Sequence, residues 1–216
     1  MNRYDLVIFD LDGTILDTSE GLLSALKFSI SEFGYPIPPE EVLNTFIGPP
    51  VQDSFSKTYG VNGDTLKKMA DLFRDRYKNE DLLLALPYEG IYRVLQTILN
   101  LGIRIAIATY KREDYAIRLL RHFSFDNYAC VMHGSDFAGS MKKQEIIQLC
   151  ISEAGIEDFN RVLMIGDTYH DAEGADNLGL DFVGVTYGFG YKSNDTITGS
   201  RVVGCAETPD DILRFL

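Results

Sequence analysis

The sequence is short of basic residues. Its 216 residues include 20 Lys and Arg against 32 Asp and Glu, which gives a net charge of −12 at pH 7. Proteins that bind nucleic acid through its phosphates need clustered Lys and Arg, and here no basic run exceeds a pair such as Lys142-Lys143. We therefore exclude nucleic acid as a general partner. The ligand of so acidic a chain has to be inferred from its individual motifs.

Cysteine is also scarce. Cys130, Cys150 and Cys205 occur without a Cys-x-x-C pair, and an odd number of scattered cysteines does not indicate a disulfide framework. A chain of this length buries about 70% of its unfolded surface, so it needs neither disulfides nor a structural metal to hold a core. We expect buried, reduced thiols in a cytoplasmic protein.

Long hydrophobic runs are missing as well. No stretch approaches the roughly 18 consecutive apolar residues that cross a bilayer. At the N-terminus, acidic residues appear at Asp5 and Asp10, too early for the apolar core of a signal peptide. The sequence therefore predicts neither a membrane span nor a secretory leader.

Short β-branched runs separated by amphipathic helical patterns dominate the rest of the chain. Near-continuous apolar strands that alternate with such helices are typical of a buried parallel sheet with helices on both faces. The predicted fold class is α/β, with a doubly wound parallel sheet. The five strand candidates are residues 6–9, 103–108, 129–132, 162–165 and 182–185.

The alternation is interrupted after the first strand. Between about residues 18 and 82 the sequence shows helical stripes punctuated by Pro and Gly, without a convincing strand. This block is too long for a simple crossover between neighbouring strands. We therefore expect an α/β core formed by residues 1–16 and 83–216, and a small α-helical domain, residues 17–82, inserted into it.

Acidic and hydroxyl residues follow several of the predicted strands. Asp10 and Asp12 come after the first strand, Thr109 ends the second, and Asp167 and Asp171 follow the strand at 162–165. Ligands of an open parallel sheet bind beyond the carboxyl ends of its strands. Carboxylates that converge there repel one another unless a cation lies among them, and Mg²⁺ suits such ligands while leaving room for a substrate phosphate. A single Asp can be a helix cap or turn residue, but the whole set predicts a metal site.

These segments resemble, in order, the four motifs of the haloacid-dehalogenase-like superfamily of phosphohydrolases. Residues 9–14 (FDLDGT) match the first motif, Thr109 the hydroxyl of the second, Lys142 or Lys143 the lysine of the third, and residues 166–171 (GDTYHD) the fourth. The inserted helical segment lies where this family carries its type-one cap domain. The resemblance implies a Rossmann-like core and a phosphoric monoester hydrolase.

The resemblance also implies roles for the acids. Asp10 would be the nucleophile that forms an aspartyl-phosphate, and Asp12 would protonate the leaving oxygen and then activate water. The implied cofactor is Mg²⁺, held by Asp10, by Asp12 through its backbone carbonyl, and by Asp167. Asp171 would either bind the metal through water or orient the lysine of the third motif.

Further residues are implied to bind the phosphoryl group and shape the loop beside it. Thr109 would donate a hydrogen bond, and a lysine would neutralise the oxygens. We prefer Lys143 to Lys142 because it opens a helical stripe at the expected offset, although the Pro that commonly follows this lysine in the family is absent. Gly13 allows a sharp turn, and Thr14 would pin it.

Three other residues are candidates for substrate binding. Tyr110 and Lys111 follow Thr109, and Lys111 either reaches the substrate or faces solvent. Gly48 lies in residues 46–54 (FIGPPVQDS), which resemble the cap loop of phosphoglycolate-phosphatase-like members; the alternative is an ordinary helix-breaking turn. Residues 185–190 (VTYGFG) are also typical of that branch.

The carboxylate of Asp12 favours phosphate esters over halides, since a halide leaving group needs no acid. We expect a Mg²⁺-dependent, phosphoglycolate-phosphatase-like enzyme acting on a small phosphorylated metabolite. Alternatives within the superfamily are 5′-nucleotidase, pyrophosphatase and β-phosphoglucomutase activity. A receiver-like phospho-accepting signalling domain is the non-enzymatic alternative, but receivers are shorter and lack a helical insertion. The sequence leaves open whether the protein is a monomer or a homodimer.

Overall fold

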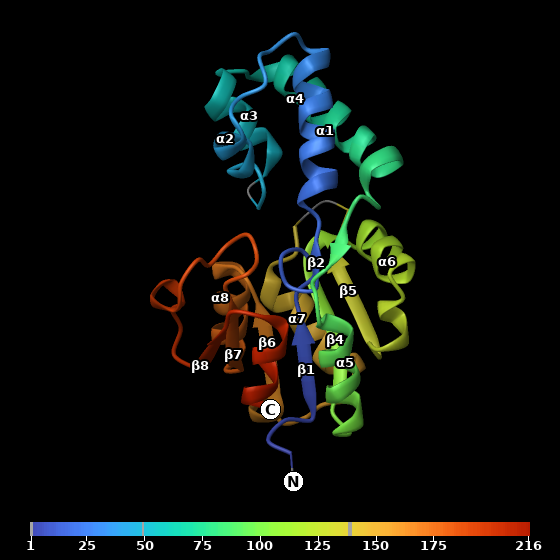
Figure 1. Ribbon diagram of the computed structural model, residues 1–216, viewed down its shortest axis with the longest axis vertical. Coiled ribbons are helices and arrows are strands. Elements are labelled where there is room, and N and C mark those ends of the chain that lie inside the picture. The colour runs from blue at the N-terminus through green and yellow to red at the C-terminus, as the bar shows by residue number, and fades with distance from the viewer. Residues whose placement is uncertain (1, 49, 138–139) are drawn as a thin grey trace. The chain divides into compact units, whose positions relative to one another are not determined.

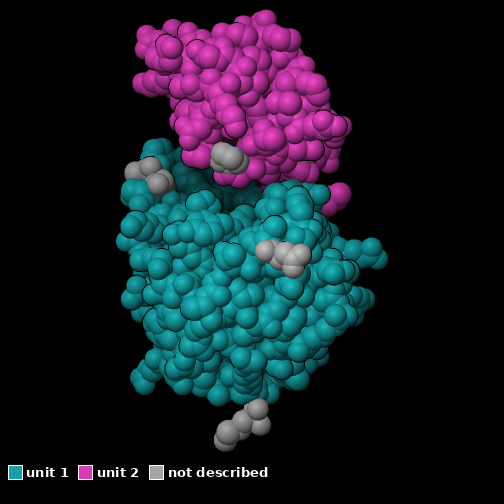
Figure 2. Space-filling view, turned by 90° about the vertical axis from the view of Figure 1, so that its left-hand side faces the viewer, with its two compact units in different colours: residues 1–17, 87–216 teal, residues 18–86 magenta. Residues whose placement is uncertain are grey.

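The computed structural model describes residues 2–48, 50–137 and 140–216. The chain forms two compact units, shown in different colours in Figure 2. One comprises Met1–Asp17 and Pro87–Leu216 and is called the α/β unit below; the other comprises Thr18–Leu86 and is called the helical unit. No described helix combines the length and the apolarity that crossing a bilayer requires.

Within the described residues, the α/β unit contains a sheet of six parallel strands in the order β5-β4-β1-β6-β7-β8. The predicted doubly wound parallel sheet is therefore confirmed. One strand, β8, was not predicted: it is only partly buried and contains Gly204, which weakens a strand pattern. The strands are β1 Leu6–Phe9, β4 Arg104–Arg112, β5 Val131–Ser135, β6 Val162–Gly166, β7 Asp181–Val185 and β8 Val202–Ala206.

Helices cover both faces of this sheet (Figure 1). On one face lie α5, α6 and the 3-10 helix η5; on the other, α7 and α8 pack against each other and against the central strands. Right-handed crossovers produce this division, because the chain runs from β1 toward β5 and then from β6 toward β8. These helices are α5 Ile91–Asn100, α6 Glu113–His122, α7 Lys143–Glu153, α8 Tyr169–Leu178 and η5 Pro209–Phe215, and the connections hold the short helices η2 Phe125–Asn127, η3 Phe159–Arg161 and η4 Asn194–Thr196.

The direction of winding reverses at β1, which lies between β4 and β6. All four residues of β1 are buried, as expected for a central strand covered by helices on both faces. Such a reversal opens a crevice at the carboxyl ends of the strands on either side of it. The fold therefore directs attention to the residues that follow β1, β4 and β6.

An irregularity in β4 lies at the same edge. Ala108 pairs with His133 and Arg112 pairs with Ser135, so four steps along β4 correspond to two along β5. Residues 109–111 fall within this bulge, and bulges turn side chains away from the regular alternation of a strand. The opposing Gly134 leaves room for it, because a Cβ there would lie 2.5 Å from the carbonyl oxygen of Lys111.

The helical unit has its own apolar core. Its helices are α1 Ser19–Glu32, α2 Glu40–Asn44, α3 Val51–Tyr59 and α4 Gly63–Arg76, which a π-helical turn, η1 Tyr77–Asp81, extends. Outside this unit's helices, a separate two-stranded sheet consists of β2 Leu16–Asp17, which belongs to the α/β unit, and β3 Leu86–Pro87, which lies at the boundary in the chain. The core of the helical unit is formed by Leu26, Ile30, Leu43, Phe46, Phe55, Val61 and Met69.

The expectation of buried thiols is partly wrong. Cys150 is buried in α7 and Cys205 is half-buried in β8, but Cys130 is exposed. Cys130 precedes β5, which is an edge strand of the sheet, and the chain there has not yet entered the core. All three cysteines are free thiols.

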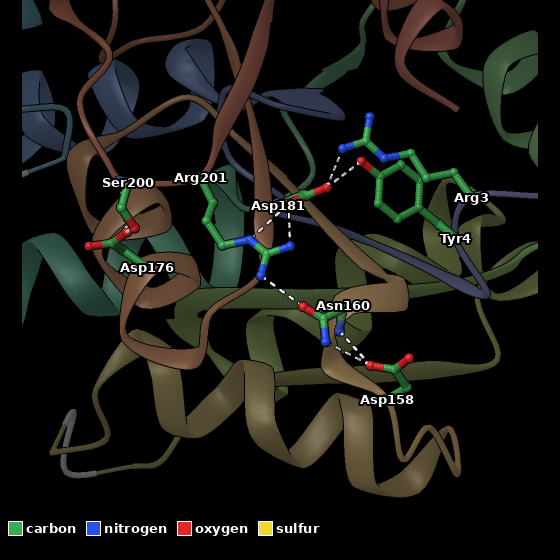
Figure 3. Close-up of polar contacts among 8 residues, drawn as sticks. All are labelled: Arg3, Tyr4, Asp158, Asn160, Asp176, Asp181, Ser200 and Arg201. Atoms are coloured by element: carbon green, nitrogen blue, oxygen red, sulfur yellow. Dashed lines mark hydrogen bonds and ion pairs between the residues drawn. The ribbon is translucent and has the colours of Figure 1, made fainter.

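A polar network ties together the amino ends of the strands (Figure 3). Asp181, the buried first residue of β7, accepts hydrogen bonds from Arg3 (2.7 Å), Tyr4 (2.8 Å) and Arg201 (2.9 Å). Arg201 also donates to Asn160, ahead of β6, at 2.9 Å. Burial alone would raise the pKa of Asp181, but the bonds from Tyr4 and Arg201 and the charges of both arginines hold it below its usual value.

We predict that Asp181→Asn lowers the free energy of unfolding by about 2 kcal/mol at pH 7, because charge-assisted hydrogen bonds are lost from a buried site. A carboxylate with a lowered pKa in the folded state stabilises the fold above about pH 4, and this contribution is lost as the pH falls through its folded pKa. Urea unfolding of the wild type and the variant should therefore converge toward acid pH. The exposed Glu157→Gln is the control, and a deficit that is independent of pH would contradict the assignment.

Candidate active site

Three buried carboxylates converge where the winding of the sheet reverses. Asp10 follows β1, Asp167 follows β6, and Asp171 lies in the first turn of α8. Each offers an oxygen that lies within 4.8 Å of those of the other two. The register explains this, since β1 and β6 are neighbours and the backbone N–H of Asp10 donates to the carbonyl of Ile165 at 2.9 Å. The structure thus brings together three of the four acids predicted to form the site.

Lys143 is the cation of this cluster. Its side chain is 3% exposed, and its Nζ lies 2.5 Å from Oδ1 of Asp10 and 2.6 Å from Oδ1 of Asp171. Lys143 is the first residue of α7, whereas Lys142 precedes the helix, is exposed, and has its backbone N–H bound by the Glu145 side chain. Of the two candidate lysines, Lys143 is the one that reaches the carboxylates.

One lysine does not compensate three buried acids. Burial raises the pKa of Asp10 well above its usual value, and the charges of Asp171 and Asp167 add to this against the opposing effect of Lys143. Burial, and then the Asp171 charge, raises the pKa of Asp167 to about 7. Burial alone would lower the pKa of Lys143, but Asp10 and Asp171 outweigh it and raise the pKa. The cluster therefore carries an excess of negative charge that a bound cation would relieve.

Asp167 is oriented by the loop after β7. Its Oδ2 accepts the backbone N–H groups of Phe189 at 2.7 Å and of Gly190 at 3.0 Å. Its Oδ1 is buried and has no hydrogen-bond partner among the described residues. An oxygen without a donor, beside two further carboxylates, fits a hard divalent cation such as Mg²⁺. The residues present thus fit the expected metal.

Glycines make this arrangement possible. Gly13 has φ +82°, and a Cβ there would collide with Oδ2 of Asp167. A Cβ on Gly188 would collide with the carbonyl of Gly13, and one on Gly190 with the carbonyl of Asp167. A role for residues 188–190 in the site was not predicted; they lie in a segment that is typical of one branch of the superfamily. Their Gly-x-Gly spacing was the available signal.

Asp12 lies outside the three-acid cluster and pairs with Lys111 instead. The Lys111 Nζ is 2.8 Å from Oδ1 and 3.1 Å from Oδ2 of Asp12, and the lysine side chain is only 8% exposed. The alternative that Lys111 faces solvent is therefore wrong. Its backbone N–H donates to Oγ1 of the buried Thr109 at 3.1 Å. This ion pair was not anticipated, because it joins residues that are far apart in the sequence.

The remaining predicted residues lie in different settings. Thr14 is buried, and its carbonyl accepts the Tyr187 hydroxyl at 2.9 Å, which fastens the loop after β1 to the loop after β7. Tyr110 is 40% exposed, and its hydroxyl accepts the backbone N–H of Lys143 at 2.8 Å. Gly48 is an exposed residue of the helical unit with φ +106°. Its role in substrate binding stays a prediction, and Pro49 beside it lies outside the described residues.

A doubly wound sheet with buried acids and a lysine at its switch point defines an α/β enzyme whose site suits an anionic substrate and a metal. The haloacid dehalogenase-like hydrolase family matches residues 7–185. The chain belongs to this family, as its motifs predicted, and it is a hydrolase of that class.

Curated relatives cover most of the chain. It is 33% identical to a 5′-nucleotidase of Pseudomonas aeruginosa, over 88% of this chain and 86% of that protein. It is 31% identical to the tyrosine-protein kinase PtkA of Mycobacterium tuberculosis, over 98% of this chain and 72% of the relative. Identity to a phosphoglycolate phosphatase of Agrobacterium fabrum is 30%, over 85% and 81% of the two chains.

Solved structures agree with the fold. A protein from Clostridium difficile, solved at 1.7 Å resolution, superimposes with a TM-score of 0.92 at 30% identity and covers all of both chains. A predicted phosphatase from Clostridium acetobutylicum gives a TM-score of 0.83 at 30% identity, over 99% of this chain and 100% of that chain. The α/β fold with an additional helical unit is therefore shared with other members of the family.

We predict that Gly13→Ala destabilises the fold more than Gly102→Ala. Both glycines have similar φ angles, +82° and +78°, but a Cβ at position 102 meets nothing within 4 Å whereas one at position 13 meets Asp167. The shared backbone strain should cost about 1–2 kcal/mol, and the collision about 1–3 kcal/mol more. Urea unfolding of both variants measures the difference. Equal losses would show that Gly13 is needed for its conformation alone.

Proposed function

We propose that the protein is a Mg²⁺-dependent phosphatase that hydrolyses small phosphate monoesters through an aspartyl-phosphate on Asp10. The observation that carries this proposal is the buried cluster of Asp10, Asp167 and Asp171 around Lys143 at the switch point of the sheet. The family membership and the phosphatases among the relatives support the same reaction class.

Asp10, Asp167 and the backbone carbonyl of Asp12 would hold the Mg²⁺ ion. When bound, the ion supplies positive charge that screens the acids from an incoming phosphate. Asp171 accepts the side-chain and backbone donors of Thr168 on one oxygen, at 2.7 and 3.0 Å, and binds Lys143 with the other. We therefore assign Asp171 chiefly to the orientation of Lys143.

The phosphoryl group would be bound by Lys143, which contacts Asp10, and by Thr109, which lies in the neighbouring strand β4. Lys143 neutralises its oxygens. The Oγ1 of Thr109 accepts a backbone N–H from Lys111, so its own O–H proton remains available to donate to a phosphoryl oxygen. Both groups are buried, where such interactions are stronger than in water.

The reaction proceeds in two steps. A carboxylate oxygen of Asp10 forms a bond to phosphorus while the ester P–O bond breaks, and Asp12 gives its proton to the leaving oxygen. Asp12 then takes a proton from the water that attacks the aspartyl-phosphate, which releases phosphate and restores Asp10. The ion pair with Lys111 presupposes an ionised Asp12, the form used in the second step. In the first step Asp12 carries a proton, and the negatively charged phosphate of the substrate takes its place as the partner of Lys111.

A small phosphorylated metabolite is the proposed substrate, with phosphoglycolate as one candidate. Nucleoside monophosphates form the second candidate class, because the Pseudomonas 5′-nucleotidase is the relative with 33% identity over 88% of this chain. We further propose that the helical unit serves as the cap domain that selects among such esters. Caps of this kind exclude water and contribute substrate contacts.

We predict that Asp10→Asn lowers kcat on p-nitrophenyl phosphate by at least about 10³-fold, because an amide cannot form the covalent intermediate. Circular dichroism should show an intact fold. The exposed Asp126→Asn is the matched control and should keep full activity. Residual turnover in Asp10→Asn comparable with that of the control would overturn the nucleophile assignment. A wild-type enzyme that releases one equivalent of product and stops would favour the receiver-like alternative.

We predict that Mg²⁺ raises the melting temperature of the wild type, and raises it more at about pH 8 than at about pH 5.5. Asp167 has a pKa raised to about 7, so its protonated form competes with the metal at acid pH. For the same reason, the metal-free protein should lose stability as the pH rises from about 4 to about 7. Differential scanning fluorimetry measures both effects. Asp167→Asn should lose the Mg²⁺ response and Asp126→Asn should keep it; an unchanged response in Asp167→Asn would place the metal elsewhere.

A further inference from the structure

We propose that Tyr110, Tyr169 and His170 form an aromatic rim beside Asp10 that binds a flat ring in the leaving group of the substrate. This inference rests on the proposed phosphatase activity and narrows its substrate class. The ring would be a nucleobase or an aryl group, and the shared recognition chemistry is stacking against a π-face.

The rim is assembled from two separate elements of the α/β unit. Tyr110 comes from the bulge of β4, and Tyr169 and His170 are the first two residues of α8. The ring centroids of Tyr110 and His170 are 5.3 Å apart at an interplanar angle of 86°, and those of Tyr169 and His170 are 6.0 Å apart at 61°. Such edge-to-face contacts hold the rings in a defined arrangement.

The position of Tyr110 links the rim to the proposed reaction centre. Its hydroxyl accepts the backbone N–H of Lys143 at 2.8 Å, and its ring centroid is 5.7 Å from the Nζ of the same lysine. That Nζ lies 2.5 Å from Oδ1 of Asp10. A phosphoryl group bound at Asp10 and Lys143 therefore has Tyr110 as a close neighbour, and a leaving group of modest length reaches the rim.

The rings remain accessible although they are fixed. Tyr110 is 40% exposed and Tyr169 57% exposed, and His170 is exposed as well. Single exposed aromatic residues are common on protein surfaces. Here three of them adjoin one another; the Tyr169 hydroxyl donates to Glu173 at 3.0 Å, and the Tyr110 hydroxyl accepts the backbone N–H of Lys143 and keeps its own proton. Besides that one O–H donor, the tyrosines offer a ligand their apolar ring surface, which a short aliphatic ester such as phosphoglycolate would leave unused.

Two matched pairs of esters test the proposal. Benzyl phosphate and cyclohexylmethyl phosphate share a CH₂–O ester and a six-membered ring and differ in aromaticity. Adenosine 5′-monophosphate and ribose 5-phosphate differ by the base. We expect the aromatic member of at least one pair to have a kcat/KM about tenfold higher, the range of a single stacking contact. A preference in the first pair identifies an aryl group near the ester, and one in the second identifies a nucleobase.

Variants of the rim residues test whether the rim causes the preference for the aromatic ester. Tyr110→Leu removes the ring and should bring the ratio of kcat/KM within the preferred pair close to one. Tyr110→Phe keeps the ring but loses the hydrogen bond to Lys143. It should therefore keep the ratio of kcat/KM within the preferred pair, even if the kcat/KM of both esters falls. The double variant Tyr169→Leu/His170→Leu alters only exposed side chains and should also reduce the ratio, which keeps the test available if Tyr110→Leu folds poorly.

The outcomes separate this inference from the function on which it rests. Wild-type ratios near one for both pairs, with turnover of all four esters, would overturn the aromatic rim and leave the phosphatase intact. A tenfold preference that survives both Tyr110→Leu and the double variant would also overturn it. Failure to hydrolyse any of the four esters with Mg²⁺ present would overturn the proposed function, and the rim with it.

Discussion

Burial of three carboxylates around a single lysine is the constraint on which the arrangement of the α/β unit depends. Isolated charges are costly to bury, and here Asp10, Asp167 and Asp171 are accommodated by Lys143, by backbone N–H groups and by the turn that begins α8. These stabilising interactions come from different segments of the chain. The glycines that pack against Asp167 serve the same end, because they let the backbone approach the acid closely enough to hold it.

The buried acids at the carboxyl ends of the strands differ from the buried acid at the amino ends in how their charge is compensated. At the carboxyl ends, the described residues supply the three acids with one lysine and leave one oxygen of Asp167 without a donor, an arrangement that suits ligand binding rather than stability. At the amino ends, Asp181 is surrounded by donors and its charge is fully matched by Arg3 and Arg201. A buried acid with several cationic and hydrogen-bonding partners stabilises the fold. A buried acid with too few such partners favours the binding of a cation.

Much of this could be predicted from the sequence, for a physical reason. The strands are contiguous apolar runs, and the rule that parallel strands present their carboxyl ends together places Asp10, Thr109 and Asp167 at one edge without any further information. Contacts between distant segments could not be predicted in this way. The pairing of Lys111 with Asp12 leaves no local pattern. The Gly-x-Gly spacing at 188–190 is a local pattern, but it does not identify Asp167 as the side chain that this backbone binds. The register of β4 against β5 is likewise set by the packing around Gly134.

The bulge in β4 gives three consecutive residues three different contacts. In a regular strand, alternate side chains share a face, so Thr109 and Lys111 would point one way and Tyr110 the other. Here Thr109 is buried, Tyr110 reaches the start of α7, and Lys111 reaches Asp12. The number of residues in this short segment, and not only their identity, therefore decides which side chains lie at the carboxyl edge of the sheet. An insertion or deletion at 109–111 in a related protein would change which side chains stand at this edge while every acid of the cluster stayed in place.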